Sequence, residues 1–131
     1  MGAVKYLLDT CTFLWLAQQP LLISATAAAA IDDPANDLGV SEVSLLEVVL
    51  KHAAGRLPLP DAPRVWIPER LEFHQLQLLS LTPEVIYRCG ELPKAHPDPF
   101  DRLLAAHAIE AGMRVLSPDR FLSELGASRV W

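Results

Sequence analysis

The 131-residue chain contains little that would mark a secreted, zinc-binding or strongly basic protein. It has two cysteines, Cys11 and Cys89, and no C-x-x-C or H-x-x-x-H pair accompanies them, which argues against a zinc site. Two isolated thiols are typical of a reduced, cytoplasmic protein. Eleven lysines and arginines against sixteen aspartates and glutamates give a net charge of −5. This balance argues against a protein that holds nucleic acid by bulk charge alone.

The sequence also lacks an uninterrupted apolar run long enough to cross a membrane. Residues 10–31 carry no charge, but several polar or helix-breaking residues interrupt them: Gln18, Gln19, Pro20, Ser24 and Thr26. Pro20 fits a loop between two helices better than a span. The start of the chain has no apolar segment of the signal-peptide kind. With 51% apolar and 21% charged residues, the chain is expected to form one packed domain over residues 1–131.

Short apolar strands alternate with helical segments along the chain. Strands are expected at residues 4–9, 37–41, 76–81, 114–117 and 128–131, and helices at 10–19, 24–33, 42–55, 64–75, 83–92, 98–112 and 119–125. This alternation predicts a parallel sheet with helices on both faces, a three-layer α/β/α fold. Sites in such folds gather at the carboxyl ends of the strands, which directs attention to Asp9 and Asp119.

The segment HPDPFDRLLAAHA places two aspartates at the start of an expected helix. Asp98 precedes Pro99, the pattern of an N-cap followed by proline at the first helical position. Asp101 would favour the positive helix end, but on a helical wheel it lies on the apolar face with Leu104, Ala105 and Ala108, whereas Arg102, His107 and Glu110 form the polar face. A carboxylate on a buried face requires a partner, and a shared metal ion would supply one. We therefore expect Asp98 to cap the helix and Asp101 to belong to a site.

The other acids have a structural and a functional interpretation each. Glu47 lies at the edge of an apolar arc formed by Val43, Leu45, Leu46, Val49, Leu50 and Ala53, and an i,i+4 ion pair with Lys51 is its structural alternative. Asp9 and Asp119 follow strands and are also candidate helix caps. Taken together, four acids at such positions form an oxygen-only ligand set, which selects Mg²⁺ or Mn²⁺. A cation would also explain how neighbouring carboxylates coexist.

Four segments in order resemble the PIN-domain ribonucleases, particularly the VapC-type toxins of bacterial toxin–antitoxin pairs. They are LLDTCTFLWL, VSEVSLLEVVLKHAAGRL, HPDPFDRLLAAHA and LSPDRF, and the match runs from Tyr6 to about Leu125. The resemblance implies a parallel sheet of about five strands and divalent-metal-dependent RNA cleavage. It also implies a cluster of four acids, carried over to Asp9, Glu47, Asp101 and Asp119.

The same resemblance assigns supporting positions. Thr10 and Ser117 match hydroxyl positions that support the site, and Asp98 matches an accessory acid. Two residues depart from the family pattern. Cys11 stands where histidine is common, which removes a polar neighbour but no metal ligand. Pro118 is unusual before the last acid, so Asp119 is the ligand whose position is most affected.

The implied reaction is hydrolysis of an RNA phosphodiester by a water held on one or two metal ions. Asp9 and Asp101 are the predicted direct ligands, Asp119 completes the shell or serves a second ion, and Glu47 orients the water or binds through it. Arg102 and Arg120 flank the acids and are candidate phosphate contacts, with surface salt bridges as the alternative.

Partners follow from the resemblance as well. It implies a homodimer and a cognate VapB-like antitoxin whose tail fills the RNA groove. Phe13 and Trp15 are candidates for the apolar wall of that groove, with core packing as the alternative. RNA selectivity is expected to involve an unpaired loop, where the bases are accessible.

Other classes fit less well. A phospho-acceptor receiver domain would have an acidic pair after the first strand, and a haloacid-dehalogenase-type phosphatase would have D-x-D, whereas this chain reads Asp9-Thr10-Cys11. The remaining alternative is a catalytically silent PIN scaffold that binds RNA or a partner protein.

Overall fold

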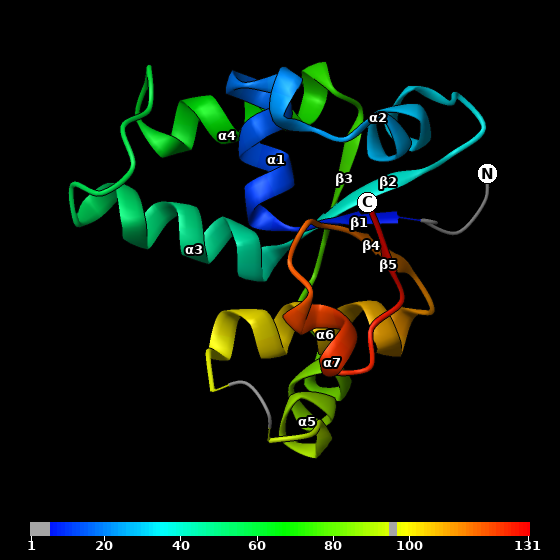
Figure 1. Ribbon diagram of the computed structural model, residues 1–131. Helices are drawn as coiled ribbons and strands as arrows, with labels where there is room; N and C mark the ends of the chain where they lie inside the picture. The colour runs from blue at the N-terminus through cyan, green and yellow to red at the C-terminus, as the bar shows by residue number, and fades with distance from the viewer. Residues whose placement is uncertain (1–5, 95–96) are drawn as a thin grey trace.

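The strands form one sheet. The computed structural model describes residues 6–94 and 97–131 (Figure 1). Five strands lie in the order β3-β2-β1-β4-β5, and every neighbouring pair is parallel. They are β1 (Tyr6–Leu8), β2 (Leu38–Ser41), β3 (Leu76–Leu79), β4 (Arg114–Leu116) and β5 (Arg129–Val130). The expected parallel sheet of about five strands is confirmed, although Val4 and Lys5, placed in the first strand, lie outside the described residues.

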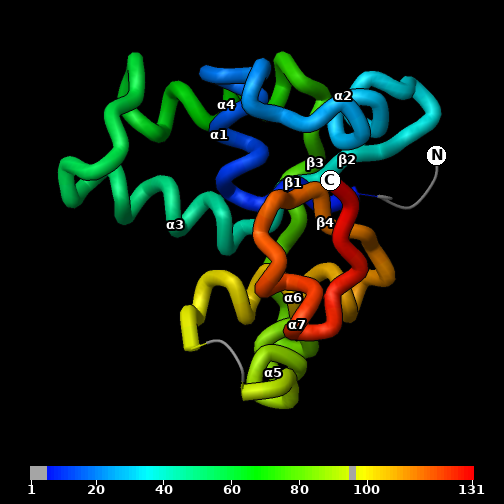
Figure 2. The backbone as a smooth tube through the Cα atoms, viewed as in Figure 1, coloured from blue at the N-terminus to red at the C-terminus, as the bar shows by residue number. Residues whose placement is uncertain are grey.

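Helices cover both faces of the sheet. They are α1 (Thr10–Gln18), α2 (Ala25–Asp32), α3 (Glu42–Ala53), α4 (Pro63–Phe73), α5 (Pro83–Glu91), α6 (Pro99–Ala111) and α7 (Phe121–Glu124), with the 3₁₀ turn η1 (Pro20–Leu22) between α1 and α2. Figure 2 shows α1, α2 and α4 on one side of the strands and α5, α6 and α7 on the other. The predicted α/β/α layering is therefore confirmed.

Alternation within the central strands builds the two cores. In β1, Leu7 packs with the cluster under α5, α6 and α7, whereas Leu8 packs with the cluster under α1 and α4. Val115 and Leu116 in β4 divide in the same way. Successive side chains of a strand point to opposite faces, so a strand of three residues serves both cores. No helix in the described part of the chain is long and apolar enough to span a membrane.

Helix ends follow the local sequence signals. Ser24, Thr82 and Asp98 each accept a hydrogen bond from a backbone N–H in the first turn of the helix they precede. Gly112 ends α6 in the left-handed conformation, with φ 68°, and its N–H donates to the carbonyls of Ala108 and Ile109. Glycine adopts this conformation without the cost that a Cβ imposes. These signals place α6, and with it Asp101, where the sequence predicted.

The apolar arc of α3 is only partly buried. Val43, Ser44 and Val48 face the core, whereas Leu46 is 48% exposed and Leu50 is 50% exposed. The buried face includes the polar residue Ser44. Its Oγ is satisfied there, because it accepts a hydrogen bond from the Thr10 hydroxyl at 2.8 Å. Periodicity locates an apolar stripe but not the element that covers it. The exposed part of the stripe is therefore a surface feature of this chain.

His107 lies in the core, so its placement on the polar face of α6 was wrong. Its side chain is buried, and Nδ1 lies 2.7 Å from Ser41 Oγ at the end of β2. Burial lowers the pKa of His107, while the charge of Glu42 acts in the opposite direction. A polar residue can occupy a helix's inner face when a hydroxyl across the interface satisfies it.

Candidate active site

The four predicted acids line one cavity of about 450 Å³ at the carboxyl ends of the central strands. Its walls come from α1, α3, α6 and the loop between β4 and α7. The residues that line it are Asp9, Thr10, Cys11, Leu14, Trp15, Val43, Glu47, Lys51, Phe100, Asp101, Leu104, Pro118 and Asp119. α3 packs against both α1 and α6, which brings these segments together.

Asp9 both caps α1 and faces the cavity. Its Oδ1 accepts a 2.7 Å hydrogen bond from the Thr12 N–H, and its Oδ2 accepts a short one from the Ser117 hydroxyl. The side chain is buried, and this burial raises the pKa of Asp9. The hydrogen bonds from Ser117 and Thr12 act in the opposite direction because they stabilise the charged form. The cap interpretation and the cavity position are therefore both correct for this residue.

Asp119 is held by two hydrogen bonds, each between a backbone N–H and a side-chain oxygen. Its N–H donates to Ser117 Oγ at 3.0 Å, and its Oδ1 accepts from the Phe121 N–H at 2.9 Å as α7 begins. Pro118 also lines the cavity, so this departure from the family pattern leaves Asp119 at the site. The buried hydroxyl of Ser117 joins the two acids, since it donates to Asp9 and accepts from Asp119.

Glu47 reaches the cavity while paired with a cation. Lys51 Nζ lies 2.7 Å from Glu47 Oε2, so the predicted i,i+4 pair is present. The side chain of Glu47 is 18% exposed and that of Lys51 is 47% exposed. The sequence interpretation treated Lys51 only as this partner, but it lines the cavity too. Its position one turn after Glu47 indicated the ion pair but not the cavity.

The two aspartates of α6 occupy different environments. Asp98 is exposed and its Oδ1 accepts from the Phe100 N–H at 2.9 Å, which confirms its capping role. It is not among the residues that line the cavity. Asp101 is half-buried and lines the cavity between Phe100 and Leu104. The helix therefore presents one acid to solvent and the other to the site.

Supporting hydroxyls tie α1 to its neighbours. Thr10 is buried, lines the cavity and donates to Ser44 on α3. Thr12 donates from Oγ1 to the Leu116 carbonyl at 2.8 Å, which fastens α1 to β4. Thr10 and Ser117 thus both lie beside the acids, and Thr12 is a further support that sequence reasoning did not identify.

The two predicted phosphate contacts lie elsewhere. Neither arginine is among the described residues that line the cavity. Arg102 donates to the carbonyls of Cys89, Leu92 and Pro93 at the end of α5. Arg120 is exposed where α7 begins. The guanidinium of Arg102 therefore secures a helix end.

Aromatic and thiol side chains complete the walls. Trp15 is half-buried, lines the cavity, and its ring centroid lies 5.9 Å from that of Trp131. Phe13 instead packs edge-on against Trp66 in the core, which confirms the core-packing alternative for this residue. Burial, and then the charge of Asp9, raises the pKa of Cys11 to about 12, so this thiol stays neutral.

The four acids line one cavity, but their carboxylates do not converge on one position. Across residues 6–94 and 97–131, no three His, Cys, Asp or Glu side chains are arranged so that they could hold a metal ion. Asp9 is turned toward Ser117 and Thr12, and Glu47 toward Lys51. The donor chemistry nevertheless suits a hard cation, because all four acidic side chains offer carboxylate oxygens.

Comparisons with known proteins identify the family and the fold. The family model described as PIN domain matches residues 6–127. The chain is 32% identical over 117 residues to Ribonuclease VapC22 of Mycobacterium tuberculosis, which covers 88% of each protein. Its fold matches VapBC2 of Rickettsia felis bound to a promoter DNA fragment, with a TM-score of 0.72 and 13% identity over 97% of this chain and 98% of that one. It also matches DNA-bound VapBC of Salmonella typhimurium, with a TM-score of 0.70 and 18% identity over 98% and 97%. The family model and the VapC22 relative show that this chain belongs to the PIN domain family.

Proposed function

We propose that this protein is an endoribonuclease that hydrolyses RNA phosphodiester bonds with the help of Mg²⁺ or Mn²⁺ and acts as the toxin of a toxin–antitoxin pair. The observation that carries the proposal is the convergence of Asp9, Glu47, Asp101 and Asp119 on one cavity. The four acids come from different parts of the sequence, with Asp9 near its start and Asp119 near its end. A relative with 32% identity that is named a ribonuclease supports the same activity.

The carboxylates are suited to divalent cations. Asp9 and Asp101 would hold the ion directly, Asp119 would complete its shell, and Glu47 would act through water. An ion bound there would lower the pKa of a water molecule and stabilise charge on the phosphate oxygens. Each carboxylate oxygen has about two acceptor positions. The hydrogen bonds that Asp9 accepts from Thr12 and Ser117 therefore leave capacity for a ligand bond.

The protein's own groups orient these acids. Ser117 and the Thr12 N–H fix the two oxygens of Asp9, and Lys51 fixes Glu47. The apolar side chains of Leu14 and Leu104 line the same cavity and reduce the water around the carboxylates. Electrostatic interactions are stronger where water is excluded, so this wall strengthens the hold of the acids on a bound cation.

The proposal includes partners. Leu46, Val49 and Leu50 form an exposed apolar face on α3, and beside it a groove of about 710 Å³ lies between α3 and α4. An apolar face of this kind supports contact with a VapB-like antitoxin and with a second copy of the chain. A solved structure of similar fold, from Klebsiella pneumoniae, is described as a toxin–antitoxin complex. We place the protein in the cytoplasm, in keeping with its free thiols.

The test is cleavage of labelled RNA by the purified protein with Mg²⁺ or Mn²⁺ and with EDTA. Cleavage should require the metal and should be lost in Asp9→Asn and Asp101→Asn. Asp61→Asn, at an exposed position outside the cavity, is the matched control and should cleave normally. Cleavage that persists in both site variants would identify a contaminating nuclease. RNA binding without metal-dependent cleavage would favour the silent scaffold.

A further inference from the structure

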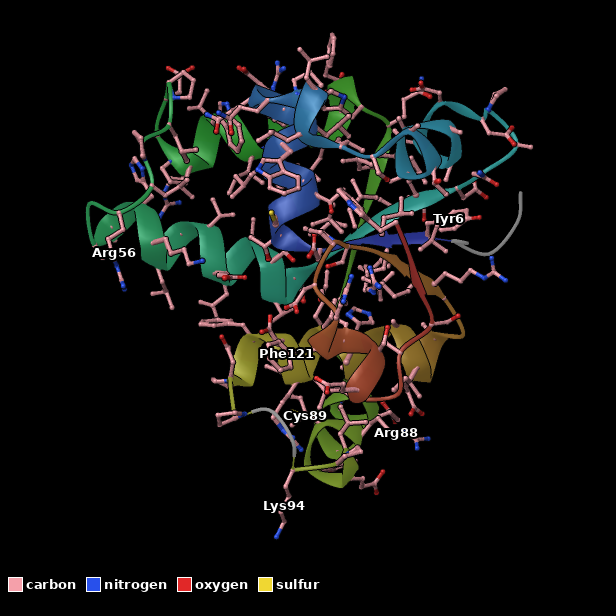
Figure 3. The ribbon with its side chains drawn as sticks, in the orientation of Figure 1. Tyr6, Arg56, Arg88, Cys89, Lys94 and Phe121 are labelled. Atoms are coloured by element: carbon pink, nitrogen blue, oxygen red, sulfur yellow. The ribbon has the colours of Figure 1, made fainter. Side chains whose placement is uncertain are left out.

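The cavity continues beyond the carboxylates along α1 and α3. Both helices begin directly after a strand, α1 after β1 and α3 after β2. Figure 3 shows Arg56 beyond the far end of α3, away from the sheet. Trp15 is four residues beyond Cys11 on α1, and Lys51 is four beyond Glu47 on α3. Four residues of helix advance about 6 Å. Trp15 and Lys51 therefore lie about one turn further from the sheet, while still lining the same cavity.

Trp15 offers a flat aromatic surface to this outer part. The ring is half-buried, unlike that of Phe13, which belongs to the core. Its contact with Trp131, at 5.9 Å and an interplanar angle of 50°, restricts its orientation. Unpaired bases are held in proteins by stacking on such side chains. A partly exposed tryptophan beside a carboxylate site is thus suited to a base.

Lys51 offers the matching charge. Among the described residues that line the cavity, it is the one with a cationic side chain. Its ammonium has three donors, and the 2.7 Å contact with Glu47 engages one of them. The side chain is 47% exposed, so the other donors can reach solvent or a phosphate oxygen. Four acids repel a phosphate, and the charge of Lys51 offsets part of this repulsion.

We propose that Trp15 and Lys51 form a subsite for one unpaired nucleotide next to the cleaved bond. The base stacks on Trp15, and its phosphate pairs with Lys51. This inference rests on the proposed nuclease function and adds the two residues that recognise an unpaired nucleotide of the RNA. Duplex RNA does not fit this subsite, because its bases remain stacked inside the helix.

The test combines binding and cleavage. Binding of a labelled single-stranded RNA and of its duplex is measured by anisotropy in EDTA, in the Asp101→Asn background. Trp15→Leu and Lys51→Gln should each weaken single-strand binding by roughly 10-fold. Lys51→Gln should also reduce the salt slope of log K by about 0.7, the value for one phosphate contact on a single strand. In active protein the same changes should raise KM more than they lower kcat.

Matched variants separate recognition from folding. Trp15→Phe and Lys51→Arg keep a ring and a charge, and each should recover most of the lost binding. Tyr87→Leu and Lys94→Gln remove an exposed ring and an exposed charge away from the cavity and should change neither binding nor KM.

The outcomes distinguish the two proposals. Metal-dependent cleavage with unchanged binding and KM in Trp15→Leu and Lys51→Gln would overturn the subsite and leave the nuclease intact. Equal affinity for the duplex would also overturn it. Loss of antitoxin-tail binding in Trp15→Leu, with RNA binding unchanged, would assign the surface to the protein partner instead. If the wild type does not cleave, the nuclease proposal fails, and the binding series in EDTA still decides the subsite.

Discussion

Ser117 donates a hydrogen bond to Oδ2 of Asp9 although 108 positions of sequence separate the two residues. The Oγ of Ser117 also accepts a hydrogen bond from the Asp119 N–H at 3.0 Å. One buried hydroxyl therefore connects the acid that follows β1 with the acid that follows β4. Because β1 and β4 are parallel neighbours, this connection is made at the edge of the sheet where both strands end.

Replacing Ser117 with alanine should reduce RNA cleavage because Asp9 is then less well oriented, although no carboxylate is removed. Asp9 would lose the short hydrogen bond to its Oδ2, and Asp119 would lose an anchor. Loss of a group that orients a metal ligand typically costs about 10–100-fold in activity or metal affinity. We expect kcat/KM to fall in that range and the free energy of unfolding to fall by roughly 1–2 kcal/mol.

Ser123→Ala is the matched control for that variant. Ser123 accepts from Arg129 at an exposed position on α7, so its loss should leave cleavage unchanged. Steady-state kinetics at several Mg²⁺ concentrations provide the measurement. Wild-type activity in Ser117→Ala would show that the hydrogen bonds from Thr12 are sufficient to orient Asp9.

The two aspartates of α6 should separate stability from cleavage. Asp98→Ala removes the cap of the Phe100 N–H and should lower the free energy of unfolding by about 1 kcal/mol, with a smaller effect on cleavage. Asp101→Asn keeps the helix and removes a cavity charge, so cleavage should fall roughly 100-fold or more at nearly unchanged stability. Urea unfolding and RNA cleavage on the same preparations check both. A large loss of cleavage in Asp98→Ala, without loss of stability, would make Asp98 a site residue.

Much of this arrangement could be predicted because it depends on local patterns. Short apolar strands followed by acids, together with parallel connections, are sufficient to bring Asp9 and Asp119 to one edge. The wheel position of Asp101 among alanines and leucines predicted its inward orientation, and the cap at Asp98 follows from the proline after it. None of these inferences required knowledge of a distant partner.

The features that could not be predicted depend on such partners. His107 is buried because Ser41, 66 positions away, lies within hydrogen-bond distance of it. Leu46, Val49, Leu50 and Ala53 of the α3 stripe are exposed because Ser44, rather than Leu46, faces α1. Lys51 appeared to be a simple ion-pair partner because a helical wheel does not show that a cavity adjoins it. In each case the deciding contact joins segments far apart in sequence.

His107 should make stability depend on pH. Burial lowers the pKa of His107 in the folded state. In the unfolded chain its pKa is about 6.5, so below that pH the unfolded chain binds a proton more readily than the folded chain does. Its contribution is therefore present above that pH and is lost as the pH falls. His107→Gln keeps a polar group near Ser41 and should flatten this loss. Urea midpoints of both proteins from pH 5 to 8 test it, and identical pH profiles would contradict it.

Arg102 should stabilise the fold rather than bind RNA. Its guanidinium donates to the carbonyls of Cys89, Leu92 and Pro93 at 2.8, 3.1 and 2.6 Å, at the end of α5 where helical carbonyls lack partners. Lysine cannot reproduce this planar fork of donors. Arg102→Lys should therefore lower the free energy of unfolding by about 1–3 kcal/mol and change the KM for RNA less than Lys51→Gln does.

The control for Arg102 is Arg56→Lys, an exposed position beyond α3 that should alter neither property (Figure 3). Thermal unfolding and KM are measured on the three proteins together. If Arg102→Lys weakens RNA binding at unchanged Tm, the guanidinium contacts the substrate and its carbonyl bonds are incidental. If Tm falls and KM stays constant, the arginine next to Asp101 acts by holding α5 against α6, which fixes the helix that carries the acid.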